Sequence, residues 1–212
     1  MTFRPAGWLR NNHATILLCT LTLGYSLFVA LRVTGNPMGT VKVTQLLAYG
    51  GTSFERLADL EFWRLATAQL VHVKQLHMLL NLAGLLLLGS LLEARLGAGR
   101  LLVIWFFAGG IATAMSPWGI EAPWNIGTGA SQATFAFASA ALAIAIVERQ
   151  ASRWLQGLAA FVLMPGLLLD ITAVGYPKPG HAVAMLLGAA FGFMFASRAR
   201  RGPVQESSAS RP

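Results

Sequence analysis

Long uninterrupted apolar runs, separated by short charged stretches, divide this chain. The runs are continuously apolar and do not alternate with polar residues, which favours helices over the strands of a barrel. A helix needs roughly 20 mainly apolar residues to cross the hydrocarbon core of a bilayer, so the pattern predicts an all-α polytopic membrane protein. Six transmembrane helices are expected, at approximately residues 14–33, 75–93, 101–118, 129–147, 154–174 and 180–197.

The stretches outside these spans differ in character. Residues 34–74 open with turn-forming residues and then mix apolar with charged residues, so we expect an outer loop that lies in the membrane interface. Residues 1–13 are expected to form a cytoplasmic N-terminal segment. Residues 198–212, polar and rich in small side chains, are expected to form a disordered cytoplasmic tail. The organisation is thus one six-helix domain, residues 14–197.

Composition narrows the class of protein. Hydrophobic residues make up 55% of the 212 positions and charged residues only 11%, against about 25% charged residues in soluble domains. This balance excludes an ordinary soluble domain, a disordered chain and a nucleic-acid module, despite the net charge of +8. The single cysteine, Cys19, allows neither an internal disulfide nor a thiolate metal site.

The distribution of basic residues predicts the orientation. Of the 16 Lys and Arg residues, ten lie on the side of the N-terminus and six on the opposite side, where four acidic residues offset them. Basic residues favour the cytoplasmic side, so both termini are expected there. The first span has a basic flank but no small-x-small cleavage site after it, which indicates an uncleaved anchor. The compact size and the absence of a transit peptide suggest a bacterial inner membrane.

Several polar residues lie inside the expected spans, where each needs an explanation. His77 and Asn81 are four residues apart and share one helical face. Ser131 lies early in the fourth span and His181 begins the sixth. Because the second, fourth and sixth spans all start on the outer side, these residues lie at similar depth, about one or two turns below the surface. A serine, a histidine and a pair of donors are the groups that acyl transfer requires.

Three segments carry a more specific signature. The first contains Trp63-Arg64, then His72-x4-His77-x3-Asn81, then Glu93-x-Arg95-x-Gly97; the second is Gly129-Ala-Ser131; the third is Gly180-His181 followed by Gly188 and Gly192. Together they resemble the rhomboid family of intramembrane serine proteases over roughly residues 60–197. The resemblance implies a six-helix bundle and a protease that cuts transmembrane segments.

The resemblance also implies a role for individual residues. Ser131 would be the nucleophile and His181 its general base, in a dyad without a third carboxylate. His77 and Asn81 would join the backbone N–H of Ser131 in holding the tetrahedral oxyanion. Phe135, one turn after Ser131, would pack its ring against His181, although a lipid- or core-facing ring fits the spacing nearly as well.

Further residues would support the site. Gly129 belongs to the nucleophile motif. Trp63 and Arg64 would lie in the outer loop, and Glu93 and Arg95 would make polar contacts at the cytoplasmic end of the second span. The small residues Gly180, Ala184, Gly188 and Gly192 would bring the last helix close to the serine helix. Asp170 lies 11 residues before His181; we expect a structural or hydrogen-bonding role for it, and no part in a triad.

Two positions depart from the family pattern. Rhomboids usually carry glycine directly after the nucleophile, where this chain has Gln132, and a smaller residue where it has Ala184. A Gln132 side chain that faced the neighbouring helix would push the serine helix away and open the dyad. One that faced the cavity would add an oxyanion donor or narrow the substrate site. The sequence leaves both open.

The expected function is therefore a serine endopeptidase acting on transmembrane protein substrates within the lipid bilayer, with no cofactor, no metal and no nucleic acid. The alternative is a catalytically inactive rhomboid-like protein that binds transmembrane segments. A small transporter or channel has only the intramembrane polar residues in its favour. Whether the protease would resemble the rhombosortases, which process C-terminal sorting tails, or the general rhomboid type is left open, as is the oligomeric state.

Overall fold

The computed structural model describes residues 11–148, 153–176 and 178–200. In this part of the chain the regular structure is helical, and one isolated antiparallel bridge joins Thr52 to Gly127. Six helical stretches are long and apolar enough to cross a membrane. Five of them are α2 (His13–Thr34), α6 (Gln75–Leu96), α9 (Ser131–Glu148), α10 (Arg153–Val174) and α11 (Pro179–Arg200). The prediction of an all-α bundle with six membrane-spanning helices is confirmed.

The third span is irregular. It consists of α7 (Ala98–Val103), a π-helical segment η3 (Ile104–Gly109) and α8 (Gly110–Met115). At the end of η3, a side chain on Gly109 would collide with Ala133 of α9, 2.9 Å away, and with the side-chain oxygen of Gln69. The glycine therefore allows this span to approach α9 closely, near the start of α9.

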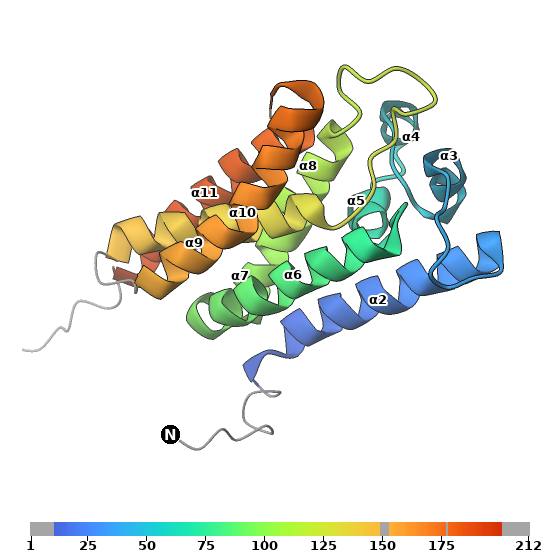
Figure 1. Ribbon diagram of the computed structural model, residues 1–212. Helices are drawn as coiled ribbons and strands as arrows, with labels where there is room; N and C mark the ends of the chain where they lie inside the picture. The colour runs from blue at the N-terminus through green and yellow to red at the C-terminus, as the bar shows by residue number, and fades with distance from the viewer. Residues whose placement is uncertain (1–10, 149–152, 177, 201–212) are drawn as a thin grey trace, which may run out of the picture.

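The segment between α2 and α6 folds into short helices at one end of the bundle, as Figure 1 shows. They are α3 (Val43–Leu46), η1 (Leu47–Tyr49), α4 (Phe54–Ala58), α5 (Arg64–Thr67) and η2 (Ala68–Leu70). Large apolar side chains of this segment, including Phe54, Phe62 and Trp63, are exposed. The expectation that residues 34–74 lie in the membrane interface remains a prediction. The expected terminal segments 1–13 and 198–212 fall mostly outside the described residues.

Hydrogen bonds define both ends of the first span, α2. The backbone N–H groups of Ala14 and Thr15 donate to the carboxylate of Glu93, at 2.9 and 2.8 Å, and the Thr15 hydroxyl donates to it at 2.7 Å. An anion at a helix N-terminus satisfies donors that have no partner within the helix. At the other end Gly35, with φ of 71°, donates its N–H to the Leu31 carbonyl and ends α2. Glu93 thus supports the fold from the end of α6, as expected.

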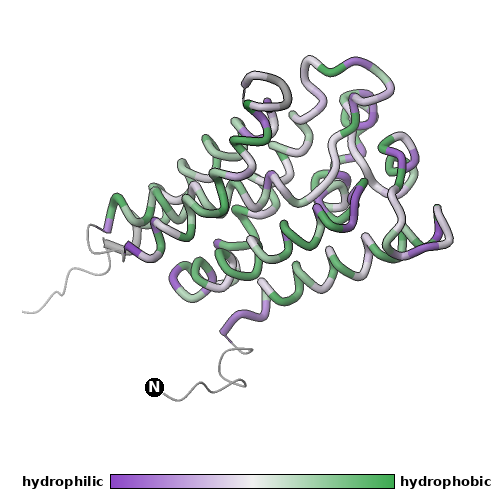
Figure 2. Tube along the Cα trace, in the orientation of Figure 1, coloured by the Kyte–Doolittle hydropathy of each residue, from purple (hydrophilic) through white to green (hydrophobic). Residues whose placement is uncertain are grey.

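Helix α9 is the centre of the bundle. Its residues from Ser131 to Ala141 are buried, and α6, α10, α11 and the η3 segment pack around it. A side chain on Gly188 would collide with the backbone carbonyl of Ala136, and one on Gly192 with that of Ala140. Gly188 and Gly192 of the expected small-residue face therefore pack against the backbone of α9, as predicted. Gly180 instead packs against α8, where a side chain on it would collide with the Ala112 carbonyl. Figure 2 shows hydrophobic residues along the bodies of the long helices and hydrophilic ones mainly near their ends and in α3–α5.

Candidate active site

The turn before α9 presents Ser131 as the first residue of this helix. Gly129 has a φ of 97°, in the left-handed region that favours glycine. Its N–H donates to the Ala68 carbonyl at 2.8 Å, and the next N–H, of Ala130, donates to Nε2 of His72 at 3.0 Å. Because both amides of the turn are bound to the segment before α6, the position of Ser131 is fixed relative to that helix.

Ser131 and His181 meet at the start of α9 and α11. The Oγ atom of Ser131 lies 3.1 Å from Nε2 of His181, within the range of a hydrogen bond. Both residues are buried. The ring of Phe135 stacks on the imidazole, with 4.2 Å between centroids and 12° between planes. Of the two positions that the spacing allowed for Phe135, the structure has the one against His181.

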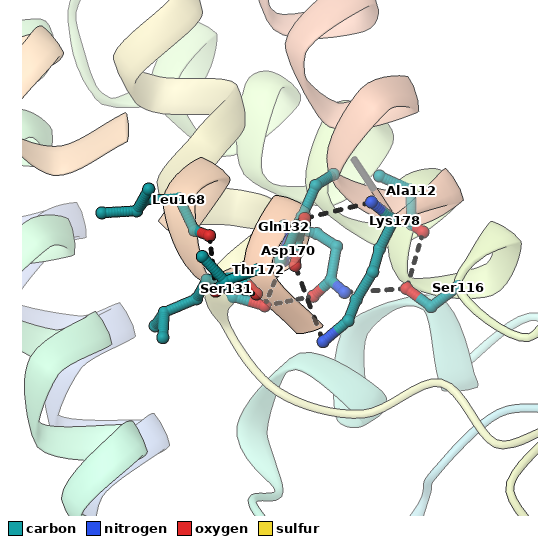
Figure 3. A network of polar contacts seen from close by, with 10 residues as sticks. Ala112, Ser116, Ser131, Gln132, Leu168, Asp170, Thr172 and Lys178 are labelled. Carbon is teal, nitrogen blue, oxygen red and sulfur yellow. Dashed lines mark hydrogen bonds and ion pairs between the residues drawn. The ribbon is translucent and has the colours of Figure 1, made fainter. Parts of the chain in front are cut away.

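A carboxylate also contacts the histidine. Oδ2 of Asp170, on α10, lies 2.6 Å from Nδ1 of His181 and accepts the N–H of Lys178 at 3.0 Å. The expected hydrogen-bonding role of Asp170 is confirmed, and its partner is the same histidine that contacts Ser131. The reason is tertiary: α10 continues as a helix past Asp170, and the chain then reverses, so that the first turn of α11 lies beside this carboxylate. Figure 3 labels Ser131, Asp170 and Lys178.

Gln132 does not separate the two residues. Its side chain is buried and turns toward α8, where its Nε2 donates to Oγ of Ser116 at 2.7 Å and its Oε1 lies 3.5 Å from Oγ1 of Thr113. The same Oε1 is 3.1 Å from Oγ of Ser131, as Figure 3 shows. Thus Gln132 faces a neighbouring helix without opening the Ser131–His181 distance, and it shares the serine hydroxyl with His181.

Two donors were expected on one face of α6. Asn81 is buried, and its side-chain Nδ2 has no hydrogen-bond partner among the described residues. Buried donors in proteins are normally paired, so this amide is able to donate to an acceptor outside the described residues. His77, one turn earlier, is more exposed and lies 6.2 Å from His72 between ring centroids. It also lies close enough to His181 to interact with it electrostatically.

A cavity of about 170 Å³ lies beside the turn that carries the serine. It is lined by His72, Val73, Lys74, His77, Thr128 and Gly129. Lys74 is exposed and directly precedes the first residue of α6. Because Gly129 lies two residues before Ser131, this cavity is adjacent to the turn that carries the serine.

His72 is a structural member of the site that was not expected at the serine turn from the sequence. Its Nε2 accepts from Ala130, so its proton is on Nδ1, which lies 3.4 Å from Oγ of Ser26; that hydroxyl donates to Gln75 at 2.9 Å. Burial, together with the nearby His77, lowers the pKa of His72 to about 3. A neutral His72 keeps an acceptor for the serine turn at working pH. The sequence signal that pointed to His72 was its position as the first histidine of the His-x4-His spacing.

The remaining expected residues lie away from the serine. Arg64 is buried in the outer segment, where it donates to Glu61 at 2.5 Å and to the carbonyls of Leu47 and Gly51 at 2.7 and 2.6 Å. Its guanidinium lies 4.4 Å from the centre of the exposed Trp63 ring. The hydrogen bond from Arg64 lowers the pKa of the Glu61 carboxyl. Both residues thus shape the segment before α6, as expected.

Arg95 lies at the opposite end of the bundle. It is ion-paired with Glu148, the last residue of α9. This pair joins the end of α6 to the end of α9, far along both helices from the residues around Ser131. Arg95 therefore supports the packing of two spans and does not contact the site.

Comparison with known proteins identifies the family of this chain. The family model of the Rhomboid domain matches residues 59–199, which include every residue of the site. Over 141 residues the chain is 28% identical to the Rhomboid protease GluP of Bacillus subtilis (strain 168). That match covers 66% of this chain but only 27% of the relative, which is a much longer protein. Since the Rhomboid domain covers more than half of the chain, including five of the six candidate spans in the described residues, this protein belongs to the rhomboid family.

Proposed function

We propose that this protein is an intramembrane serine protease that hydrolyses peptide bonds in or near transmembrane segments of other membrane proteins. The observation that carries the proposal is the 3.1 Å approach of Ser131 Oγ to His181 Nε2, at the starts of two membrane-spanning helices. A serine hydroxyl is a weak nucleophile unless a base takes its proton. An imidazole nitrogen at this distance is such a base.

The chemistry follows from the positions of these groups. As Oγ of Ser131 bonds to the scissile carbonyl carbon, its proton passes to Nε2 of His181 and the carbonyl oxygen becomes an oxyanion. When the tetrahedral intermediate collapses, Nε2 gives that proton to the leaving nitrogen and the C–N bond breaks. Water then attacks the acyl-enzyme, losing one proton to Nε2, which returns it to Oγ as the ester bond breaks.

The oxyanion would be held by three donors: the backbone N–H of Ser131, the Asn81 amide and His77. The unpartnered Nδ2 of Asn81 supports this role, because a developing negative charge would supply the acceptor that it lacks. Removing one such donor costs on the order of 10²- to 10³-fold in kcat. No cofactor takes part in these steps.

The substrate would be a transmembrane helix that unwinds near the membrane surface. Six apolar helices fit embedding in a lipid bilayer, and the cavity beside Lys74 supports access of water from the end of the bundle where α6 begins. Unwinding exposes backbone groups that lipid cannot satisfy, so small or helix-breaking residues at the cleavage site would be favoured. The bias of basic residues supports an orientation with both termini cytoplasmic, in a bacterial inner membrane.

One observation favours a second candidate, a rhomboid-like protein that binds transmembrane segments without cutting them. Oε1 of Gln132 lies as close to the Ser131 hydroxyl as His181 does, at 3.1 Å. A hydroxyl carries one proton, so donation to Gln132 would leave His181 without it. The proposal therefore needs a direct test of serine reactivity.

The test uses the purified full-length protein in lipid nanodiscs and a fluorescent fluorophosphonate. We expect the parent to be labelled and to cleave a model transmembrane substrate, and Ser131→Ala and His181→Ala to do neither. The matched control is Ser139→Ala, two turns along the same helix, whose hydroxyl bonds, within the described part of the chain, only to backbone carbonyls of its own helix. A folded parent that binds the substrate but is neither labelled nor active would replace the protease by the binding protein.

A further inference from the structure

We propose that Asp170 is a positioning residue for the general base, so that the reacting group is Ser131–His181–Asp170 rather than an isolated serine–histidine pair. This inference rests on the proposed protease function. It concerns a residue on α10, a helix that otherwise packs mainly on α9. The Asp170 carboxylate is the group on α10 that contacts the His181 imidazole directly.

The first support is the tautomer that the geometry requires. A carboxylate can only accept hydrogen bonds, and Oδ2 of Asp170 lies 2.6 Å from Nδ1 of His181. The proton of the neutral imidazole must therefore be on Nδ1. Its Nε2, 3.1 Å from Ser131, is then left with a free lone pair. This is the form that can accept the serine proton.

The second support is that the carboxylate is fully partnered. A buried charge is tolerated only when it is paired and hydrogen-bonded, and Asp170 is 1% exposed. Its Oδ2 accepts from His181 and from the Lys178 N–H, and its Oδ1 lies 3.6 Å from the Lys178 ammonium. Lys178 and Asp170 are both drawn in Figure 3. An anion is thus held at Nδ1 without access to water.

The third support is that α10 contacts the surroundings of the imidazole twice. Gly166 lies one turn before Asp170, on the same face of α10. A side chain on Gly166 would collide with the ring of Phe135, at 2.5 Å from its Cζ. That ring in turn stacks on His181. Asp170 therefore contacts the Nδ1 edge of the His181 imidazole. The absence of a side chain at Gly166 leaves room for the Phe135 ring, which stacks on the face of that imidazole.

Asp170 neither takes up nor releases a proton in this reaction. When Nε2 takes the serine proton, the imidazolium carries protons on both nitrogens, and Asp170 keeps its negative charge opposite Nδ1. The other charged or titratable groups near the imidazole are Lys178 and His77, and neither is an anion. Asp170 is thus the group that stabilises the positive charge formed during the reaction.

The experiment compares Asp170→Asn and Asp170→Glu with the parent in nanodiscs. For Asp170→Asn we expect kcat to fall between about 10²- and 10⁴-fold with KM within about twofold, because an amide N–H facing Nδ1 places the imidazole proton on Nε2. Asp170→Glu should regain part of kcat. Thr172→Val, on the same helix, is the matched control and should keep the parental kcat, since among the described residues its hydroxyl bonds only to carbonyls of its own helix.

The tautomer itself is measured by ¹⁵N NMR of protein labelled at its four histidines, with His181 assigned from His181→Gln. We expect the proton on Nδ1 in the parent and on Nε2 in Asp170→Asn, which a merely structural carboxylate would not produce. Parental kcat in Asp170→Asn, or a parental His181 protonated on Nε2, would overturn the inference. If Asp170→Asn does not fold, the parent tautomer and the kcat of Asp170→Glu decide.

Different results would overturn the protease function and the role of Asp170. Cleavage by the parent that is lost in Ser131→Ala but kept in Asp170→Asn would leave the protease and remove the triad. A folded parent that neither cleaves nor reacts with the fluorophosphonate would remove both.

Discussion

The two ends of α9 are held in different ways. At the Ser131 end, buried polar contacts dominate: His181, Gln132 and the His72-bound turn all hydrogen-bond at or next to the serine. Toward the Glu148 end, the contacts are steric, with Gly192 of α11 against the backbone of Ala140 and one ion pair at the helix terminus. One helix thus combines a network of hydrogen bonds with a closely packed apolar half.

This difference separates stability from chemistry. Close packing of small residues brings helices together where lipid offers no hydrophobic gain from association. Hydrogen bonds have directions, so they fix which atom of a side chain faces which partner. We therefore expect substitutions in the packed half to reduce folding, and substitutions around Ser131 to reduce cleavage while the bundle persists.

The largest effect is expected for Gly192→Leu in the packed half. A Cβ at Gly192 would lie 2.6 Å from the Ala140 carbonyl oxygen and 2.9 Å from Cα, so α11 must move away from α9. Overpacking costs about 1–3 kcal/mol or more, and thermal unfolding in detergent should show it together with lost labelling. Gly157→Leu is the control, because no atom lies within 4 Å of a Cβ there. Equal unfolding temperatures for the two variants would contradict the close packing.

The next effect is expected for Gly166→Ala at the serine end. The new methyl group would displace the Phe135 ring from His181, so cleavage should fall by roughly tenfold while the unfolding temperature changes little. Steady-state cleavage of a model transmembrane substrate measures this, with Gly157→Ala on the same helix as control. Unchanged kcat in Gly166→Ala would show that the stacked ring does not position the base.

A smaller effect is expected for the pH dependence of stability. Burial lowers the pKa of His72 from 6.5 to about 3, so below pH 6.5 the unfolded chain binds a proton that the folded protein does not. The free energy of unfolding should therefore fall from pH 6.5 toward pH 3, by up to about 1.4 kcal/mol per pH unit from this residue. His72→Gln keeps an acceptor for Ala130 but does not titrate, so its melting curves should depend less on pH. Parallel curves for parent and variant would contradict a buried neutral His72.

The smallest effect is expected for Arg95→Gln at the Glu148 end. Its ion pair is partly exposed, and such pairs contribute about 0–1 kcal/mol. Labelling and cleavage should equal those of the parent, and the unfolding temperature should fall slightly and only at low salt. A loss as large as that of Gly192→Leu would mean that polar contacts, and not packing, hold this half of α9.

The sequence by itself determined the class of fold and most of the site. Continuous apolar runs require helices in lipid, because each backbone group must be satisfied within its own segment. The six spans could therefore be read from hydropathy. Ser131, His181, His77 and Asn81 could be selected because polar residues in such runs are costly and lie near the starts of three spans that begin on the same side.

Only the tertiary structure decided how these residues face one another. From the sequence, Asp170 was not expected in a triad, since 11 residues of chain do not reveal where α10 ends and how α11 returns. The direction of Gln132 was also left open, and His72 was not placed beside the serine turn. These contacts depend on helix rotation and on the path of loops, which packing of the whole bundle sets. Hydropathy is a property of each segment alone, whereas a hydrogen bond between two segments depends on the placement of both.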